Sequence, residues 1–269
     1  MQQKGPAIAL TIIMLTMFGC NLLTQQGTET QAPEAGGAPF ETVQTEPAQA
    51  ENPDQGLCAN PYYPVRPGAT WTYTGTGSLA SDYSFTDTIT DVRTDGFTLT
   101  SQFDELTRTQ EWACTPEGLA SLTFGGGPAA GINVNEMQFD LTTSNVQGII
   151  LPQTINAGDQ WSYSLDFEGT MDVTGASANA TGTAHYDFTA LGEESLTVPA
   201  GTFNAMKIKA VLTLNIKVSY AGTETPVSLT STTDIWFVPG VGWVKAISTG
   251  QFMGQQTDDT IELQSYNIP

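Results

Sequence analysis

The sequence predicts a nearly all-β fold: a strongly curved antiparallel sheet, a half-barrel or barrel-like sandwich made of two related halves. The chain of 269 residues contains 40 threonines and 27 glycines, while Asp, Glu, Lys and Arg together make up only 13%. Threonine is β-branched and suits strands, and glycine marks turns. After residue 58, aromatic and β-branched residues alternate with polar ones, and no stretch of a dozen residues shows a helical period.

Residues 1–19 are expected to form a lipoprotein signal peptide. Lys4 precedes an apolar stretch at residues 7–18, and about 12 apolar residues are too few to span a bilayer. The tetrapeptide Met17-Phe18-Gly19-Cys20 resembles a bacterial lipobox, although Met17 stands where Leu is usual and Phe18 where a small residue is usual. The resemblance implies that Cys20 is lipidated and anchors the chain outside the cytoplasm, on the outer face of the cell membrane or on an outer membrane.

Residues 20–57 are expected to form a disordered acidic tether. This segment is rich in Gln, Thr, Glu, Ala, Gly and Pro and has no basic residue, so it offers nothing from which a core could form. A flexible chain of this length reaches about 30–35 Å, which holds the following domain clear of the membrane. That domain, residues 58–269, is expected to be a single all-β unit.

Turn signals and alternation place the strands. In the first half, residues 58–150, strands are expected at 70–79, 83–92, 96–103, 107–114 and 118–124, with one or two more within 132–152. Asp95-Gly96 and Pro116-Glu117-Gly118 are hairpin signals between them. In the second half, residues 151–269, strands are expected at 160–173, 180–191, 194–198, 203–219, 227–238, 242–253 and 257–266. The longest of these favour a curved sheet with bulges.

Two pairs of similar segments, one member of each pair in each half, indicate a degenerate internal duplication. Trp71-Thr72-Tyr73 follows a glycine turn, and Trp161-Ser162-Tyr163 does the same 90 residues later. Residues 112–119 (WACTPEGL) also resemble residues 236–243 (WFVPGVGW). The alternative is chance, because Trp-x-Tyr strands are common in β-proteins.

The segment Val198-Pro199-Ala200-Gly201-Thr202-Phe203 and the later run at 236–245 (WFVPGVGWVK) carry a family resemblance. Together they resemble a family of uncharacterised bacterial envelope and lipoprotein domains. The resemblance implies a fold akin to the half-barrel lipoprotein carriers, and it implies no defined activity.

The cysteines predict one disulfide. With Cys20 taken by lipid, Cys58 and Cys114 remain as an even pair in an oxidising compartment. The alternative is two buried free thiols.

No catalytic or metal-binding motif is recognisable. His185 is the sole histidine and is expected on a sheet surface. The carboxylates of the two halves are expected mostly at solvated strand edges and turns, namely Asp82, Asp87, Asp91, Asp95, Asp104, Glu105, Glu111, Asp258 and Asp259. No enzyme activity, cofactor or metal is therefore expected. The net charge of −20 also disfavours nucleic acid as a partner.

The tryptophans are the remaining candidates for a ligand site. Trp71, Trp161, Trp236 and Trp243 could line an apolar groove, with Trp243 at its rim beside a glycine turn, or they could fill the core. The first hypothesis is a non-catalytic lipoprotein whose curved sheet binds an apolar, lipid-like ligand or an envelope protein. The alternative is a cell-surface structural or adhesion module with a filled core. A third hypothesis is a carbohydrate-active enzyme that uses two of the carboxylates.

Overall fold

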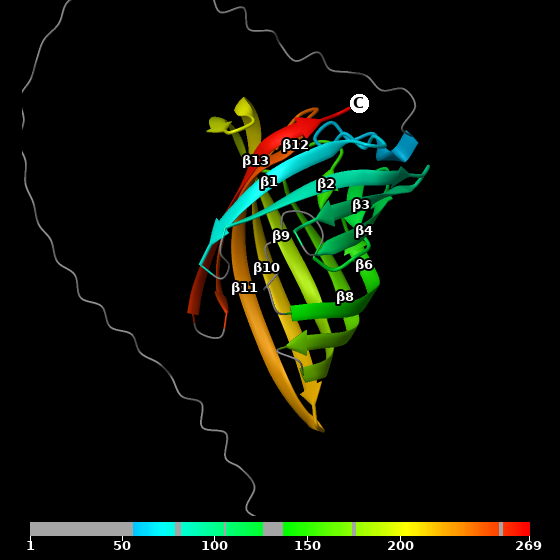
Figure 1. The fold of residues 1–269 in the computed structure, drawn as a ribbon. Helices are drawn as coiled ribbons and strands as arrows, with labels where there is room; N and C mark the ends of the chain where they lie inside the picture. The colour runs from blue at the N-terminus through cyan, green and yellow to red at the C-terminus, as the bar shows by residue number, and fades with distance from the viewer. Residues whose placement is uncertain (1–55, 79–81, 105, 126–136, 174–175, 253–254) are drawn as a thin grey trace, which may run out of the picture. The chain divides into compact units, whose positions relative to one another are not determined.

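The computed structural model describes residues 56–78, 82–104, 106–125, 137–173, 176–252 and 255–269. These residues form one antiparallel sheet of 13 strands (Figure 1). The strands are β1 (Thr70–Gly77), β2 (Tyr83–Val92), β3 (Gly96–Gln102), β4 (Thr107–Cys114), β5 (Gly118–Ser121), β6 (Met137–Gly148), β7 (Leu151–Pro152), β8 (Gln160–Val173), β9 (Ala176–Val198), β10 (Gly201–Tyr220), β11 (Thr223–Val238), β12 (Gly242–Phe252) and β13 (Gln255–Asn267), preceded by a short 3-10 helix, η1 (Gly56–Cys58). The predicted all-β class and curved antiparallel sheet are confirmed.

The strand order is β6-β8-β9-β10-β11-β12-β13-β1-β2-β3-β4-β5-β7. Most neighbours are consecutive in the chain, but the last strand also pairs with the first, so β13 and β1 join the two halves in the middle of the sheet. The sheet is curved and not closed, and its edges are β6 and β7. Only Ile149 and Ile150 separate these two edge strands in sequence, and Ile149 bonds to β8 while Ile150 bonds to β5. The two edges therefore meet at this point.

Alternation explains which residues face inward. In β1 the threonines Thr70 and Thr72 are partly exposed, whereas Trp71 and Tyr73 are buried, as the period of two in a strand requires. β9, β10 and β11 are much longer than the strands of the first half and extend beyond them at the lower end of Figure 1. The β10–β11 hairpin turns through Ala221 and Gly222, both at positive φ, as a two-residue turn of this kind demands.

A predicted break between two strands is wrong, whereas other predicted strand ends differ from the structure by a few residues. Separate strands were expected at 180–191 and 194–198, but β9 runs without a break from Ala176 to Val198. Its pairing with β10 shifts at Leu191, because Lys207 is opposite Gly192 and Ile208 is opposite Ala190. Gly192 has φ 117, so the chain makes a bulge there without leaving the sheet. A glycine that looks like a strand end in sequence is a bulge in the structure.

The residues before β1 form a strap across one end of the sheet, which we define as residues 58–65. Its start is joined to β4 by the predicted disulfide, Cys58–Cys114, with the two Cα atoms 4.9 Å apart. Asn60 donates to the carbonyl of Pro152 in β7 at 3.0 Å, and Pro61 accepts from Gly240 in the β11–β12 turn at 2.7 Å. The strap therefore ties together three separate parts of the sheet.

The duplication, the tether and the domain limits remain predictions. Residues 1–55 and part of the predicted strand region 132–152 lie outside the described residues, and Cys20 is among them. Within the part that is described, no helix has the length and apolarity needed to cross a lipid bilayer.

Candidate functional site

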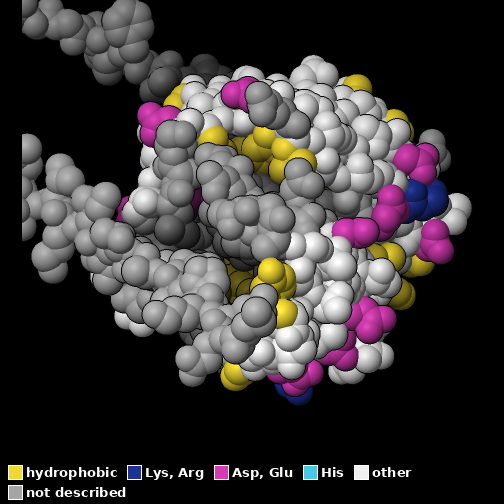
Figure 2. Space-filling model, turned by 60° about the horizontal axis from the view of Figure 1, so that its bottom comes forward, with side chains coloured by type: hydrophobic (Ala, Val, Ile, Leu, Met, Phe, Trp, Pro, Cys, Tyr) yellow, Lys and Arg dark blue, Asp and Glu magenta, His cyan; other side chains and the backbone are white. Residues whose placement is uncertain are grey.

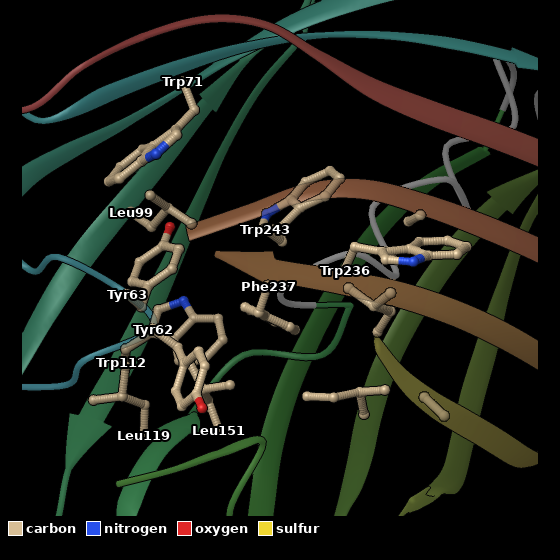
Figure 3. Close-up of a cluster of buried hydrophobic side chains, with 14 of the residues drawn as sticks. Tyr62, Tyr63, Trp71, Leu99, Trp112, Leu119, Leu151, Trp236, Phe237 and Trp243 are labelled. Atoms are coloured by element: carbon tan, nitrogen blue, oxygen red, sulfur yellow. The ribbon is translucent and has the colours of Figure 1, made fainter. Parts of the chain in front are cut away.

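At the end of the sheet that the strap crosses, which we call the upper end, the interior is filled with aromatic rings. Tyr63 from the strap stacks on Trp71 with ring centroids 5.1 Å apart and also packs on Trp112 (Figure 3). It stacks on Phe97 as well. The Trp71 indole nitrogen donates to the carbonyl of Val241 at 2.6 Å. A residual cavity of only about 20 Å³ remains here, room for about one water molecule. This end is packed core.

The four candidate tryptophans do not line one cavity, and of the four only Trp243 borders either of the two cavities found in the described part of the chain. Trp71 and Trp243 are both buried in the upper core, with 0% and 2% of their surfaces exposed. Trp161 is half-buried, stacks on Phe188 at 5.3 Å, and donates to the carbonyl of Ile150. The expectation that Trp243 lies at a rim is wrong, because strands and rings of both halves cover it.

Trp236 faces the opposite side of the sheet. Its neighbours Ile235 and Phe237 line the interior, so alternation directs Trp236 to the convex face. There its indole nitrogen donates to the Glu194 carboxylate at 2.5 Å, and the Lys207 ammonium lies 4.7 Å from the ring centroid. Figure 3 shows it apart from the cluster around Tyr63. Trp236 is therefore buried, with its polar contacts to Glu194 and Lys207, and it lines neither cavity.

A second cavity, of about 40 Å³, lies deeper along the interior. Its lining is mostly apolar and comes largely from β8 to β11, for example Leu165, Phe188, Ile208 and Ile235. The hydroxyl-bearing residues Ser121, Thr123, Tyr163, Tyr186 and Thr233 complete it, together with Phe124, Gly125, Ile150, Ala210 and Phe237. Seen from below, hydrophobic side chains gather inside the hollow of the sheet and acidic ones lie on its outer surface (Figure 2).

A row of polar side chains crosses the interior face of β2, β3 and β4. Asp87 is paired with Ser101, and Ser101 is paired with Arg108, so the three are direct neighbours across the strands. Asp87 and Ser101 are 5% and 1% exposed. The Ser101 hydroxyl donates to Asp87 at 2.5 Å, and the Arg108 guanidinium donates to the Gly125 carbonyl at 3.0 Å. The ion pairs found among the described residues do not include one between Asp87 and Arg108.

Burial perturbs each ionisable group near this row. It raises the pKa of Asp87 to about 7, although the Ser101 hydrogen bond and the Arg108 charge oppose the rise. Burial likewise lowers the pKa of Arg108, while Asp87 and Tyr186 raise it. The pKa of Tyr186 is raised to about 12 by burial, against the nearby Arg108 charge. Desolvation is thus the main cause in all three.

The sequence-based interpretation missed Asp87, Ser101, Arg108 and Tyr186. Asp87 was counted with the solvated carboxylates, which is wrong, because it stands between Phe85 and Ile89 on the buried face of β2. The alternation Phe85-x-Asp87-x-Ile89 was the available signal, and it places a carboxylate in an apolar row. By contrast, His185 is exposed, as expected, and its Nε2 atom lies 3.2 Å from the carboxylate of Asp187 on the same strand, β9.

Among the described residues, no pair of carboxylates of the kind that a carbohydrate-active enzyme uses faces the cavity. Asp87 is the one buried Asp or Glu among them, and no carboxylate lines the cavity wall. Nor do the described His, Cys, Asp and Glu residues form a group of three that could hold a metal ion. The arrangement suits binding through apolar contact and hydrogen-bond donors.

Comparison with known proteins finds one matching family model and several solved structures with limited similarity. Residues 129–250, a little under half of the chain, match the family described as DUF3108-like. No curated protein is significantly similar. Among solved structures, a Bacteroides fragilis protein proposed to be exported, with a YmcC-like fold, is 13% identical, with a TM-score of 0.47 over 78% of this chain and 100% of its own.

Two further structures are similar at lower scores. A Parabacteroides distasonis protein proposed to be a lipoprotein is 15% identical, with a TM-score of 0.42 over 77% of this chain and 99% of its own. The hypothetical lipoprotein YmcC of Escherichia coli is 10% identical, with a TM-score of 0.32 over 77% of this chain and 87% of its own. The predicted resemblance to an uncharacterised family is confirmed by the family match, because residues 129–250 match a family described as DUF3108-like.

Proposed function

We propose that this protein is a lipid-anchored, extracytoplasmic, non-catalytic protein that binds an apolar, lipid-like ligand inside its curved sheet. The observation that carries the proposal is the apolar cavity between the long strands β8–β11 and the segment after β5. Ligand sites are typically concave and apolar with a few polar groups that orient the ligand, and this cavity has that composition.

The location rests on the N-terminal sequence and on the disulfide. Gly19-Cys20 follows a short apolar stretch, which supports lipidation of Cys20. The Cys58–Cys114 disulfide supports an oxidising compartment outside the cytoplasm, because thiols stay reduced inside most cells.

The cavity must enlarge to hold a ligand. Its 40 Å³ has room for about three water molecules, far below a volume of several hundred Å³ for a drug-sized ligand. Phe124 is the lining ring that lies outside any strand, half-buried and 4.6 Å from Phe167. Its backbone nitrogen is held by the Thr143 hydroxyl at 3.2 Å. We therefore expect an entering chain to take the place of Phe124.

The packed upper core supports a second candidate, a structural or adhesion module without a ligand. The aromatic cluster around Tyr63 leaves about 20 Å³ unfilled. If the lower cavity also stays closed, the sheet is a filled scaffold, and its outer surface would carry the function.

Native mass spectrometry separates the two candidates. The mature chain is produced with Cys20→Ser behind an ordinary cleavable export signal, so that no anchor lipid is present, and its native and denatured masses are compared. A mass lost on denaturation, and found as a lipid in the organic extract, supports the ligand-binding function. Ala210→Leu fills the cavity and should reduce that mass, whereas Thr213→Leu, on the outer face of the same strand, should not. A bare native mass that added lipid does not change supports the filled module.

A further inference from the structure

We propose that Arg108 and Tyr186 bind the acid group of a single-chain anionic amphiphile, whose hydrocarbon chain occupies the apolar cavity. The acid is a carboxylate or a phosphate, which present the same anionic oxygens to a guanidinium. This inference rests on the proposed function and specifies the head group of its ligand.

Arg108 has hydrogen-bonding capacity to spare. A guanidinium has five N–H donors, and the hydrogen bonds among the described residues use one Nη2 atom, directed to the Gly125 carbonyl. Gly125 lines the cavity, so its carbonyl places the guanidinium at the cavity wall. A half-buried guanidinium in apolar surroundings favours a planar anion that accepts two hydrogen bonds at once.

Asp87 does not use up this capacity. The Ser101 side chain stands between the two groups in the cross-strand row and donates its hydroxyl to Asp87. The raised pKa of Asp87, about 7, also means that a substantial fraction is uncharged near neutral pH. The positive charge of Arg108 is therefore incompletely neutralised within the interior.

Tyr186 supplies a second donor on the opposite wall. It lies directly across from Tyr163 in the β8–β9 pair, and both rings line the cavity. The Tyr163 hydroxyl donates to the Ser121 carbonyl at 2.5 Å, whereas none of the hydrogen bonds between described residues uses the Tyr186 hydroxyl. Gly125, which accepts a hydrogen bond from the Arg108 guanidinium, lines the same cavity as Tyr186, so both groups border one space. The Arg108 charge also lowers the pKa of Tyr186, against the larger effect of burial.

The net charge of the protein favours binding of an anionic amphiphile over binding of a small free anion. With a net charge of −20, the protein repels dissolved phosphate or acetate. A hydrocarbon chain that leaves water for the cavity offsets this repulsion, because burying each methylene is favourable. The Arg108 and Tyr186 donors then hold the acid group where the cavity meets the polar row.

Calorimetric titration of dodecanoate, dodecyl phosphate and dodecanol tests the inference. The protein is the delipidated mature chain with Cys20→Ser. We expect dodecanoate or dodecyl phosphate to bind at least about tenfold more tightly than dodecanol, which has the same chain and no charge. Whichever acid binds more tightly identifies the head group as carboxylate or phosphate.

Variants assign the effect to the site. Arg108→Met should reduce the affinity for the acids by about tenfold or more and leave dodecanol within about twofold. Lys209→Met, which removes an exposed charge from the outer face of β10, is the matched control and should change none of the three. Arg108→Lys keeps the charge and should retain part of the preference, and Tyr186→Phe should weaken it in a chain that keeps its ring packing.

The outcomes separate the head-group assignment from the proposed function. If all three compounds bind equally, or if the Arg108 and Tyr186 variants keep the full preference for acids, the assignment is wrong while an apolar site stands. If none of the compounds binds, both the assignment and the proposed function fail.

Discussion

The ring of Tyr73 lies flat on the indole of Trp243, with centroids 3.9 Å apart and planes 6° from parallel. The hydroxyl of the same tyrosine donates to the backbone carbonyl of Trp243 at 3.0 Å. One residue comes from the first strand and the other from the twelfth, so this pair joins the two halves of the chain inside the upper core.

Removing the Tyr73 hydroxyl should destabilise the protein. Tyr73→Phe leaves the ring stacking intact but leaves the buried Trp243 carbonyl without its donor, so the free energy of unfolding should fall by about 1–3 kcal/mol. Urea denaturation measures the loss. Tyr220→Phe, at a tyrosine that is 57% exposed, is the control and should have almost no effect. Equal stabilities of the two variants would mean that the hydrogen bond contributes nothing.

The disulfide should hold the strap in place. Cys58 and Cys114 are 56 residues apart, and a loop of that length constrains the unfolded chain by about 4 kcal/mol in the entropic model. Replacing both cysteines by serine should lower the free energy of unfolding by an amount of that order. The Cys20→Ser chain, which keeps the disulfide, is the reference in the same urea titration. An unchanged midpoint would show that the strap docks without the covalent link.

Gly148 should be intolerant of a side chain where the two sheet edges meet. A Cβ atom at Gly148 would collide with the Ser162 carbonyl of β8, whereas a Cβ at Gly240 would meet nothing. Their φ angles are nearly equal, 74 and 73, so the backbone strain of alanine is matched. We expect Gly148→Ala to cost about 1–3 kcal/mol more than Gly240→Ala, measured by thermal or urea unfolding. Equal costs would mean that the edges can separate freely.

The burial of Asp87 should make stability depend on pH. Its folded-state pKa of about 7 lies above the ordinary unfolded value, so the folded protein holds this proton more tightly. Stability is therefore greatest below about pH 4 for this group and falls as the pH rises towards 7, by about 3–4 kcal/mol in total. Asp87→Asn should remove this component from unfolding free energies measured between pH 4.5 and 7.5.

The exposed residue Asp95 provides the charge-matched control for that measurement. In the Asp95→Asn variant, the free energy of unfolding should change between pH 4.5 and pH 7.5 by the same amount as in the unmodified chain. Parallel pH curves for the Asp87 variant and the unmodified chain would show that Asp87 is charged without cost in the folded state.

Lipidation of Cys20 is expected to retain the protein at a membrane. Cys20→Ala removes the thiol that would carry the acyl groups, so the chain should lose metabolic palmitate label and move to the soluble extracytoplasmic fraction. Cell fractionation with immunodetection measures where the protein is, and the palmitate label in the immunoprecipitated protein measures its acylation. A variant that remains membrane-bound without label would overturn the lipobox interpretation.

Local signals in the sequence determined the strands and the disulfide. A strand buries every second residue, so the spacing of Trp71 and Tyr73 was enough to predict a strand there. Asp95-Gly96 predicted a turn from these two residues alone. Cys58 and Cys114 could be paired because Cys20 was assigned to lipid and no other cysteine was left. The bulge in β9 was misjudged because a glycine ends one strand and bends another with the same local sequence.

Only the tertiary structure decided what meets inside the sheet. Alternation can place Asp87, Arg108 and Tyr186 on an inward face, but it carries no information on which strands oppose each other across the interior. Arg108 and Tyr186 are separated by 78 positions, and their proximity depends on the pairing of β13 with β1 and on the curvature of all the strands between. Through-space contacts of this kind arise from the summed twist and register of the sheet, which no single segment of sequence contains.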